Sequence, residues 1–213
     1  MFNLKFILIS SVLLFTNCLT SSENKEPMLF SDLKEELSDY DVAYFASGCF
    51  WCVEAIFESV NGVKEAVSGY SGGHSKNATY KKVSAGLTNH AETVAVYYDS
   101  DIIDYQTLLI VFFGSHDPTT KNQQGPDKGS QYRSVIFYQN DQEKQLSENY
   151  IRKLLDDNVF DKITTELTEF EAFYPAEKHH QNYKQKNPND SYVKNVSKPR
   201  LERFKKNHKE LLK

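Results

Sequence analysis

The chain has 213 residues, a formal net charge of −4 at pH 7 and an aromatic content of 13%. Disordered and low-complexity chains carry fewer aromatic residues, so the composition predicts a folded globular protein. The negative net charge argues against nucleic acid as a partner, because surfaces that bind nucleic acid are basic. Without its first thirty or so residues, the chain still has the length of one domain with a sizeable core.

The N-terminal stretch has the layout of a secretory signal, with one lysine, an apolar run from Phe6 to Phe15 and then small polar residues. The run is too short for a membrane-spanning helix. We expect residues 1–20 to be a signal peptide or lipoprotein signal and residues 21–40 to be a linker. Cys18 stands where bacterial lipoprotein signals carry the lipidated cysteine, although Asn17 is larger than the usual residue there. The stretch therefore predicts export in a bacterium, to the periplasm or to a membrane through a lipid anchor; an ordinary cleaved signal would discard Cys18.

Hydrophobic periodicity and turn residues predict the elements of the domain in chain order. The stretch 41–46 reads as a short buried strand, which Ser47-Gly48 ends. Apolar residues then recur at helical spacing from Phe50 to Val60, and Asn61-Gly62 ends that helix. The remaining predicted elements are strands over 63–67, 90–98 and 132–138, helices over 105–113 and 141–156, and an extended segment over 163–173.

Helices that alternate with strands in a single unit predict an α+β fold, a two-layer α/β plait of the ferredoxin-like kind with the helices on one face of the sheet. Two long irregular segments, from Ser115 to Gln131 and after Tyr174, are rich in His, Asp, Asn and Tyr. Loops of this length are often functional, so we expect them to form the walls of a site. The catalytic domain is expected over residues 41–195. Residues 196–213 are basic and predict a solvated C-terminal helix or tail.

Two cysteines lie three residues apart where the first helix begins. Cys49 opens the helix, where the positive end of the helix dipole stabilises a thiolate, and Cys52 lies on the same face. This geometry suits a reversible disulfide, although inert structural cysteines have the same spacing. A zinc site would need two further ligands in similar spacing, and the sequence has no second cysteine pair, although His179-His180 could contribute to such a site. We therefore predict no metal.

Glu92 lies in the predicted strand 90–98 on the same side as Val94 and Val96. This parity predicts a carboxyl group on an apolar face, where burial raises the pKa and keeps the proton on the group near neutral pH. A glutamate at the end of a strand that turns toward solvent would fit the same pattern. The sequence around Glu92 alone leaves both possibilities open.

Five stretches resemble the motifs of the type A peptide-methionine sulfoxide reductases, in family order over about residues 41–185: GCFWCVE, GYSGG, YKKVSAGLTNHAETVAVYYD, HDPTTKNQQGPDKGSQYRSVIF and FYPAEKHHQNY. Motifs of this length rarely coincide by chance. The resemblance implies reduction of methionine-S-sulfoxide, free or in proteins, to methionine, which repairs oxidised proteins. It implies no metal or organic cofactor, with thioredoxin or another dithiol as the reductant, and we expect a monomer.

The resemblance also assigns roles to residues. The family's nucleophile falls on Cys49 and its proton donor to the sulfoxide oxygen on Glu92. The two hydrogen-bonding tyrosines fall on Tyr80 and Tyr132, and the supporting carboxylate on Asp127; from the sequence pattern alone, these three would be packing and turn residues.

Two aromatic residues, Phe50 and Trp51, match the pocket for the S-methyl group of the substrate. Apolar aromatic rings suit this task, because a methyl group offers only dispersion and apolar area. Packing in the core is the alternative role, and it suits Phe50, which belongs to the helical stripe, better than Trp51.

The chain departs from the family pattern at three positions: Cys52 and Asn89 replace a common glycine, and His179 replaces a common aromatic residue. Many members carry recycling cysteines in a C-terminal tail, whereas no cysteine follows Cys52 here. Cys52 is therefore the expected resolving thiol. Two rival functions remain, a thiol–disulfide oxidoreductase that uses Cys49 and Cys52 on protein disulfides, and a binding domain without activity.

Overall fold

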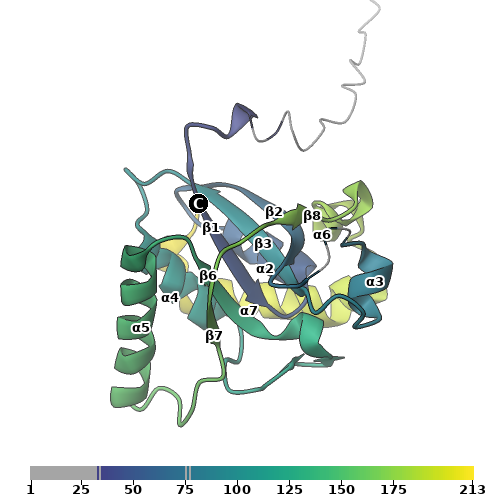
Figure 1. Cartoon of the computed structure of the whole chain (residues 1–213). Coiled ribbons are helices and arrows are strands. Elements are labelled where there is room, and N and C mark those ends of the chain that lie inside the picture. Colours follow the sequence, from purple (N-terminus) through teal and green to yellow (C-terminus); the bar gives the residue numbers. More distant parts are fainter. Residues whose placement is uncertain (1–32, 34, 75, 77) are drawn as a thin grey trace, which may run out of the picture.

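The computed structural model describes residues 33, 35–74, 76 and 78–213, which form a mixed α+β fold around a six-stranded, mostly antiparallel sheet (Figure 1). The predicted signal and Cys18 lie outside the described residues. Among the helices of the described part, none has the length and apolar character that crossing a membrane requires.

The centre of the sheet consists of four strands that are antiparallel to their neighbours, in the spatial order β6-β1-β3-β2. Helix α2 connects β1 to β2, and helix α4 follows β3, so strands and helices alternate as predicted. At the two edges, β7 pairs with β6 in parallel and β8 pairs with β2. The bounds are β1 (Asp41–Ser47), α2 (Phe50–Glu58), β2 (Val63–Ser71), β3 (Ala91–Tyr98), α4 (Tyr105–Ser115), β6 (Ser134–Tyr138), β7 (Glu166–Glu169) and β8 (Tyr174–Pro175).

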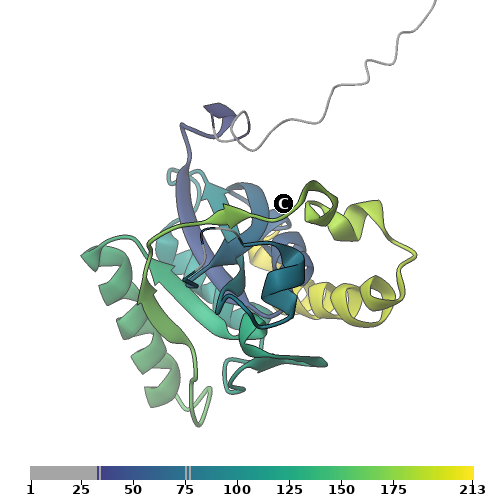
Figure 2. The same cartoon turned by 45° about the vertical axis from the view of Figure 1, so that its right-hand side comes forward.

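The main hydrophobic core lies between the sheet and helices α2 and α4 (Figure 2). Phe45 of β1 is completely buried there, with its ring centroid 5.3 Å from those of Phe57 on α2 and Phe112 on α4. Helix α5 (Asp141–Asp156) packs against α4 and β6. On the opposite face, Tyr44 stacks on Phe170 at a centroid distance of 3.8 Å, so irregular chain covers that face. The prediction that the helices cover one face describes this arrangement well.

The two long irregular segments contain several further elements, and apart from the C-terminal helix sequence patterns did not predict them. The first holds a small hairpin of β4 (Gln123–Gln124) and β5 (Asp127–Lys128), followed by the 3₁₀ turn η1 (Ser130–Tyr132). Helix α3 (Tyr80–Ser84) lies between β2 and β3. The segment after β8 holds η2 (Lys178–His180), α6 (Tyr183–Lys186), the π-helical turn η3 (Val193–Ser197), α7 (Lys198–Asn207) and η4 (Lys209–Leu211).

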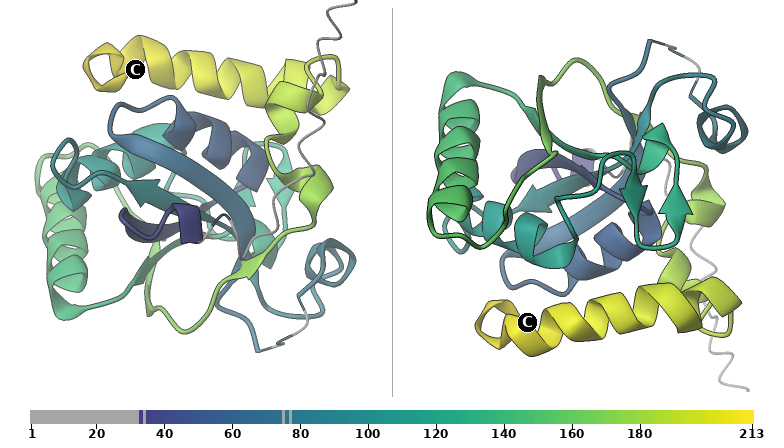
Figure 3. Two further views of the ribbon diagram at one scale, coloured as in Figure 1. Left: turned by 90° about the horizontal axis from the view of Figure 1, so that it is seen from above. Right: turned by 90° about the horizontal axis from the view of Figure 1, so that it is seen from below.

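The basic C-terminal stretch forms a helix, as predicted, but the prediction that it is solvated is wrong for one face of α7. Arg200, Leu201 and Phe204 are buried, and α7 packs against α2 and α4 on the side away from the sheet (Figure 3). These residues lie one and four positions apart, so they share one face of the helix. The lysines occupy the other face and give the stretch its basic composition, which hid the amphipathic pattern.

Candidate active site

A pocket of about 320 Å³ opens where β1 ends and α2 begins. Of the eight residues predicted for catalysis, resolution and substrate binding, the pocket brings together seven, and Cys52 is not part of its lining. Three further residues from the C-terminal segment, Tyr183, Asp190 and Tyr192, complete the wall. The seven predicted residues that line the pocket are Cys49, Phe50, Trp51, Tyr80, Glu92, Asp127 and Tyr132.

A sharp turn at Gly48 places Cys49 in the pocket. Gly48 has φ +89°, and a β-carbon there would lie 2.6 Å from the Gln124 side chain, so the turn requires glycine. The chain leaves β1, turns, and enters α2 with Cys49 as its N-cap residue. Cys49 is only 5% exposed, on the floor of the pocket, and Cys52 is 1% exposed behind it.

The charge distribution in the cysteine pair differs from the prediction that the helix dipole would favour a Cys49 thiolate. Burial raises the pKa of Cys49 well above its usual value. A hydrogen bond from Cys49, together with the Arg200 charge and the Ser197 hydroxyl, lowers the pKa of Cys52 to about 6. The first amide of α2 is engaged elsewhere, because the Phe50 N–H donates to the Glu92 carboxyl group at 3.0 Å. The opposite pKa shifts of the two thiols favour Cys52 as the site of the negative charge in the free pair.

Glu92 is 2% exposed, which confirms the burial that its position in the strand predicted. This burial is the main cause that raises the pKa of Glu92 to about 8, and the charges of Asp127 and Cys52 raise it further. The hydrogen bond from Phe50 acts in the opposite direction, although it is the weaker effect. Glu92 is thus a protonated acid at neutral pH and lies in the same pocket as the thiol.

Tyrosine hydroxyls line the pocket beside Glu92. Burial, followed by the Glu92 charge, raises the pKa of both Tyr80 and Tyr132, so both remain hydrogen-bond donors. Asp127 acts on a third tyrosine, because the Tyr192 hydroxyl donates to its Oδ2 at 2.5 Å. Sequence reasoning expected a wall from this part of the chain but did not identify Tyr192, which lies 65 positions from Asp127.

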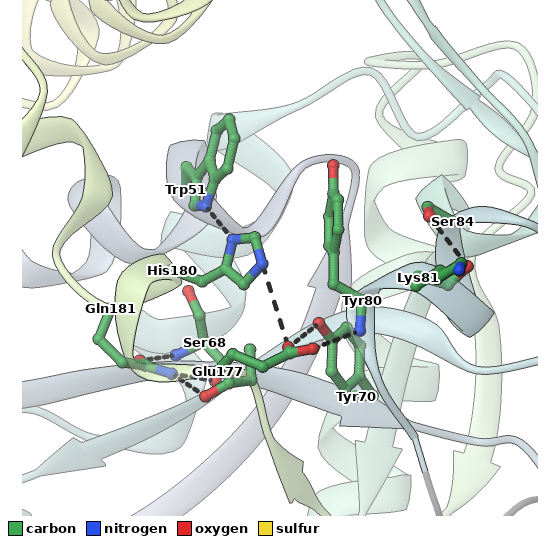
Figure 4. A network of polar contacts seen from close by, with 10 residues as sticks. Trp51, Ser68, Tyr70, Tyr80, Lys81, Ser84, Glu177, His180 and Gln181 are labelled. Atoms are coloured by element: carbon green, nitrogen blue, oxygen red, sulfur yellow. Dashed lines mark hydrogen bonds and ion pairs between the residues drawn. The ribbon is translucent and has the colours of Figure 1, made fainter.

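The Trp51 indole is fixed on two sides by the C-terminal segment. Its ring stacks on Tyr183 with a centroid distance of 3.7 Å and an interplanar angle of 8°. Its Nε1–H donates to Nδ1 of His180 at 3.2 Å (Figure 4). The His180 ring in turn lies 4.4 Å from the Tyr80 ring. These contacts hold the indole as a rigid apolar wall of the pocket.

Two carboxyl groups anchor the C-terminal segment to the rest of the site. Glu177 accepts the backbone N–H of Tyr80 at 2.9 Å and the hydroxyl of Tyr70 at 3.1 Å (Figure 4). Glu54, buried on α2, accepts the hydroxyl of Ser68 and the backbone N–H of Asn182. Burial raises the pKa of Glu54 to about 8, as it does for Glu92, but Glu54 does not line the pocket and its contacts are structural.

The departures at Asn89 and His179 fit the structure without disturbing the pocket. Asn89 has φ +57°, a left-handed conformation that asparagine tolerates best after glycine. His179 is exposed and stacks on His180 with ring centroids 4.1 Å apart. Over the residues that the structure describes, no group of three or more His, Cys, Asp and Glu side chains is placed to hold a metal ion.

Comparison with known proteins agrees with this geometry. The sequence pattern of the family described as "Peptide methionine sulfoxide reductase" matches residues 41–212. The chain belongs to this family. It is 50% identical to the peptide methionine sulfoxide reductase MsrA of Natronomonas pharaonis over 161 residues, which are 75% of this chain and 90% of that protein. The corresponding protein of Acinetobacter baumannii is 47% identical over 171 residues, 80% of this chain and 98% of the relative.

Two solved structures of family members share the fold. Mxr1 from Saccharomyces cerevisiae in its reduced form aligns with a TM-score of 0.64 and 34% identity, over 72% of this chain and 88% of that chain. Methionine sulfoxide reductase A of Corynebacterium diphtheriae aligns with a TM-score of 0.63 and 33% identity, over 70% of this chain and 76% of the other. The protein is an oxidoreductase of the peptide methionine sulfoxide reductase family.

The raised pKa of Glu92 has a consequence for stability. A carboxyl group whose folded pKa exceeds its unfolded value binds more protons in the folded state, so stability is present below the unfolded pKa and is lost as the pH rises toward the folded value of about 8. Glu92→Gln removes this titration. Chemical denaturation between pH 5 and 8 should show the free energy of unfolding of the wild type falling relative to the variant, by up to about 1.4 kcal/mol per pH unit. A constant difference over this range would contradict the burial of an uncharged Glu92.

Proposed function

We propose that the protein reduces methionine-S-sulfoxide, free or in proteins, to methionine through a Cys49 sulfenic acid and a Cys49–Cys52 disulfide. One observation carries this proposal: a buried thiol, a carboxylic acid that is protonated at neutral pH and an aromatic wall meet in one pocket. These are the groups that a sulfoxide requires, because its sulfur accepts a nucleophile while its oxygen must gain a proton. The preference for the S epimer follows from the family and not from the pocket.

In the first step, the substrate methyl group packs against Phe50 and Trp51, and the sulfoxide oxygen faces Glu92. The attack starts from the form of the cysteine pair in which Cys49 is the thiolate and Cys52 is the thiol. The Cys49 sulfur then attacks the sulfoxide sulfur. As the S–O bond weakens, negative charge gathers on the oxygen. Glu92 donates its proton there, while the hydroxyls of Tyr80 and Tyr132 donate hydrogen bonds to the same oxygen. Asp127 supports this set of donors through the Tyr192 hydroxyl. The hydroxyl group then passes to the Cys49 sulfur as the bond between the two sulfurs breaks. The substrate sulfur keeps that electron pair and leaves as methionine, reduced by two electrons, and Cys49 is left oxidised as a sulfenic acid.

In the second step, the Cys52 sulfur attacks the sulfenic acid, water leaves, and a disulfide joins Cys49 to Cys52. Cys49 and Cys52 are the only cysteines in the part of the chain that the structure describes. An external dithiol, for which we propose thioredoxin, then reduces the disulfide by thiol–disulfide exchange, and neither a metal nor an organic cofactor takes part.

We further propose that the protein is a monomer and that its four central strands and two connecting helices form a ferredoxin-like plait. The strand order β6-β1-β3-β2 supports the plait.

An assay of the purified protein with racemic methionine sulfoxide and dithiothreitol tests the function. Half of the racemate should be converted to methionine, and Cys49→Ser should lose all but a trace of this activity, because a serine hydroxyl does not ionise near neutral pH. A thiol–disulfide oxidoreductase would instead reduce a protein disulfide and leave the sulfoxide intact. A binding domain would do neither. Full activity in Cys49→Ser would overturn the assignment of the nucleophile.

Cys52→Ser separates the two steps. The first step needs only Cys49, so the variant should release about one methionine per enzyme in a single-turnover experiment. Multiple turnover with thioredoxin should collapse, since no other thiol within the domain resolves the sulfenic acid. Mass spectrometry should detect a sulfenic acid in the variant and a Cys49–Cys52 disulfide in the wild type. Continued thioredoxin-dependent turnover in Cys52→Ser, or a disulfide from Cys49 to Cys18, would contradict the proposed role.

We also propose that the protein is exported, either to the periplasm or as a lipoprotein anchored through Cys18. The apolar run and the polar stretch that follows it support this proposal. Mass spectrometry of the N-terminus of protein from the producing cell should find the chain beginning at a lipid-modified Cys18, in the membrane fraction. A soluble mature chain that begins after Cys18 would support the periplasmic alternative. An intact N-terminus in the cytoplasm would refute export.

A further inference from the structure

The resolving cysteine lies in a polar site that none of the assigned roles explains. The Cys52 sulfur is 3.0 Å from the Ser197 hydroxyl oxygen and 4.0 Å from the Tyr192 hydroxyl oxygen. Cys52 and Ser197 are each 1% exposed, so this contact is closed to solvent. A hydroxyl that donates to sulfur stabilises the thiolate more than the thiol.

Ser197 lies at the start of α7, where a serine side chain usually caps the helix. It is the N-cap residue of α7, and a serine there commonly accepts a hydrogen bond from an amide of the first helical turn. Ser197 instead has helical backbone angles, φ −67° and ψ −45°, and makes no such capping bond. Its hydroxyl points across to α2 and contacts Cys52, 145 positions earlier in the chain.

A fixed positive charge lies behind this contact. The Arg200 side chain is 6% exposed, its Nε donates to the Ser115 carbonyl at 2.8 Å, and its Nη2 donates to the Ser47 carbonyl at 2.8 Å. Backbone carbonyls orient the guanidinium without neutralising it. Its charge therefore acts on Cys52, and it contributes to the low pKa of this thiol.

The two sulfurs also differ in access. Cys49 lines the open pocket, whereas Cys52 does not and is covered by Ser197 and Tyr192. A reductant that enters through the pocket therefore meets the sulfur of Cys49 first. Exchange is faster when the departing sulfur is the more stable thiolate, and Cys52 has that property.

We propose, on the basis of the function above, that Ser197 and Arg200 form a thiolate site for Cys52, which serves Cys52 first as nucleophile and then as leaving group. In the resolving step, the Cys52 thiolate attacks the Cys49 sulfenic acid, an S–S bond forms, the S–O bond breaks, and the departing hydroxide takes up a proton as water. In the recycling step, a thiolate of the external dithiol attacks the Cys49 sulfur, and the electron pair of the S–S bond goes to Cys52. The second thiol of the reductant then releases Cys49, and the reductant leaves as a disulfide.

Ser197→Ala tests the resolving step, with Ser191→Ala as the matched control, because Ser191 is an exposed serine of the same segment. Enzyme is mixed with one equivalent of methionine sulfoxide and quenched at intervals, and methionine and the Cys49–Cys52 disulfide are measured separately. In Ser197→Ala, the loss of one hydrogen bond to a charged group should slow disulfide formation by about tenfold at pH 5, where Cys52 is mostly protonated in both proteins. At pH 7 the same loss should slow it by only about twofold, because a pKa shifted from about 6 by one unit still leaves half of Cys52 as thiolate. Methionine release should slow much less, and Ser191→Ala should match the wild type in both measurements.

The pH profile distinguishes a thiolate site from a packing role. Cys52 is faced by Ser197 and Tyr192 from the C-terminal segment, by the Arg200 charge, by Cys49 and by the Glu92 carboxyl group. When the Ser197 hydroxyl is removed, the pH at which disulfide formation reaches half of its maximal rate should rise by about one unit. An unshifted profile, or an equal slowing of methionine release and disulfide formation, would overturn the proposal.

Two further measurements test the thiolate site of Cys52 independently of the proposed reduction of methionine sulfoxide. Hydrogen peroxide oxidises Cys49 to the sulfenic acid without a sulfoxide substrate, so the Ser197→Ala comparison can be repeated with peroxide even if the wild type reduces no sulfoxide. The recycling step is tested with oxidised wild-type protein and a thioredoxin whose second active-site cysteine is replaced by serine. Acid quenching and peptide mapping should find the mixed disulfide on Cys49. A mixed disulfide on Cys52 would overturn its assignment as the leaving group.

Discussion

The hydrogen bond from the backbone N–H of Phe50 to the Glu92 carboxyl group is the contact on which the arrangement of the site depends. It joins the first turn of α2 to the middle of the sheet, at the place where the chain has just turned through Gly48. The same contact holds the Glu92 carboxyl group at the start of α2, next to Cys49 in the sequence. The Gly48 turn and this bond together bring the acid and the thiol into one pocket.

Burial of this bond controls the protons of the pocket. Glu92 keeps its proton because a charge there would have little contact with water, and Cys49 keeps its proton for the same reason. The pKa shifts favour Cys52 as the site of the negative charge in the free pair, beside the Ser197 hydroxyl and the Arg200 charge. Glu92 remains protonated at neutral pH, as a reaction that consumes a proton at oxygen requires. In the proposed mechanism, Cys49 attacks from the form of the pair in which Cys52 holds the proton.

The sequence predicts those parts of the fold and site that depend on local patterns. Strand parity places Glu92 on the apolar side of β3, and the three-residue spacing places Cys52 behind Cys49 on α2, because both follow from the geometry of a single element. The charge of the pair depends on tertiary contacts, because burial raises the pKa of Cys49 at a helix start where the dipole alone would lower it. Tyr192, Ser197 and Arg200 contact residues that lie 65 to 153 positions away. A local sequence pattern does not predict such long-range contacts. The buried face of α7 is different, since Arg200, Leu201 and Phe204 follow a local helical spacing, which the many lysines around them masked.

The C-terminal segment gives the site its particular form in this chain. It supplies Tyr183 and His180 to fix Trp51, Tyr192 to meet Asp127, and Ser197 and Arg200 to surround Cys52. Cys52, the resolving thiol in our proposal, lies on α2 one helical turn from Cys49, and the C-terminal segment packs over it. The segment then has a further task, because a buried cysteine can act as a nucleophile only if something other than water stabilises its charge.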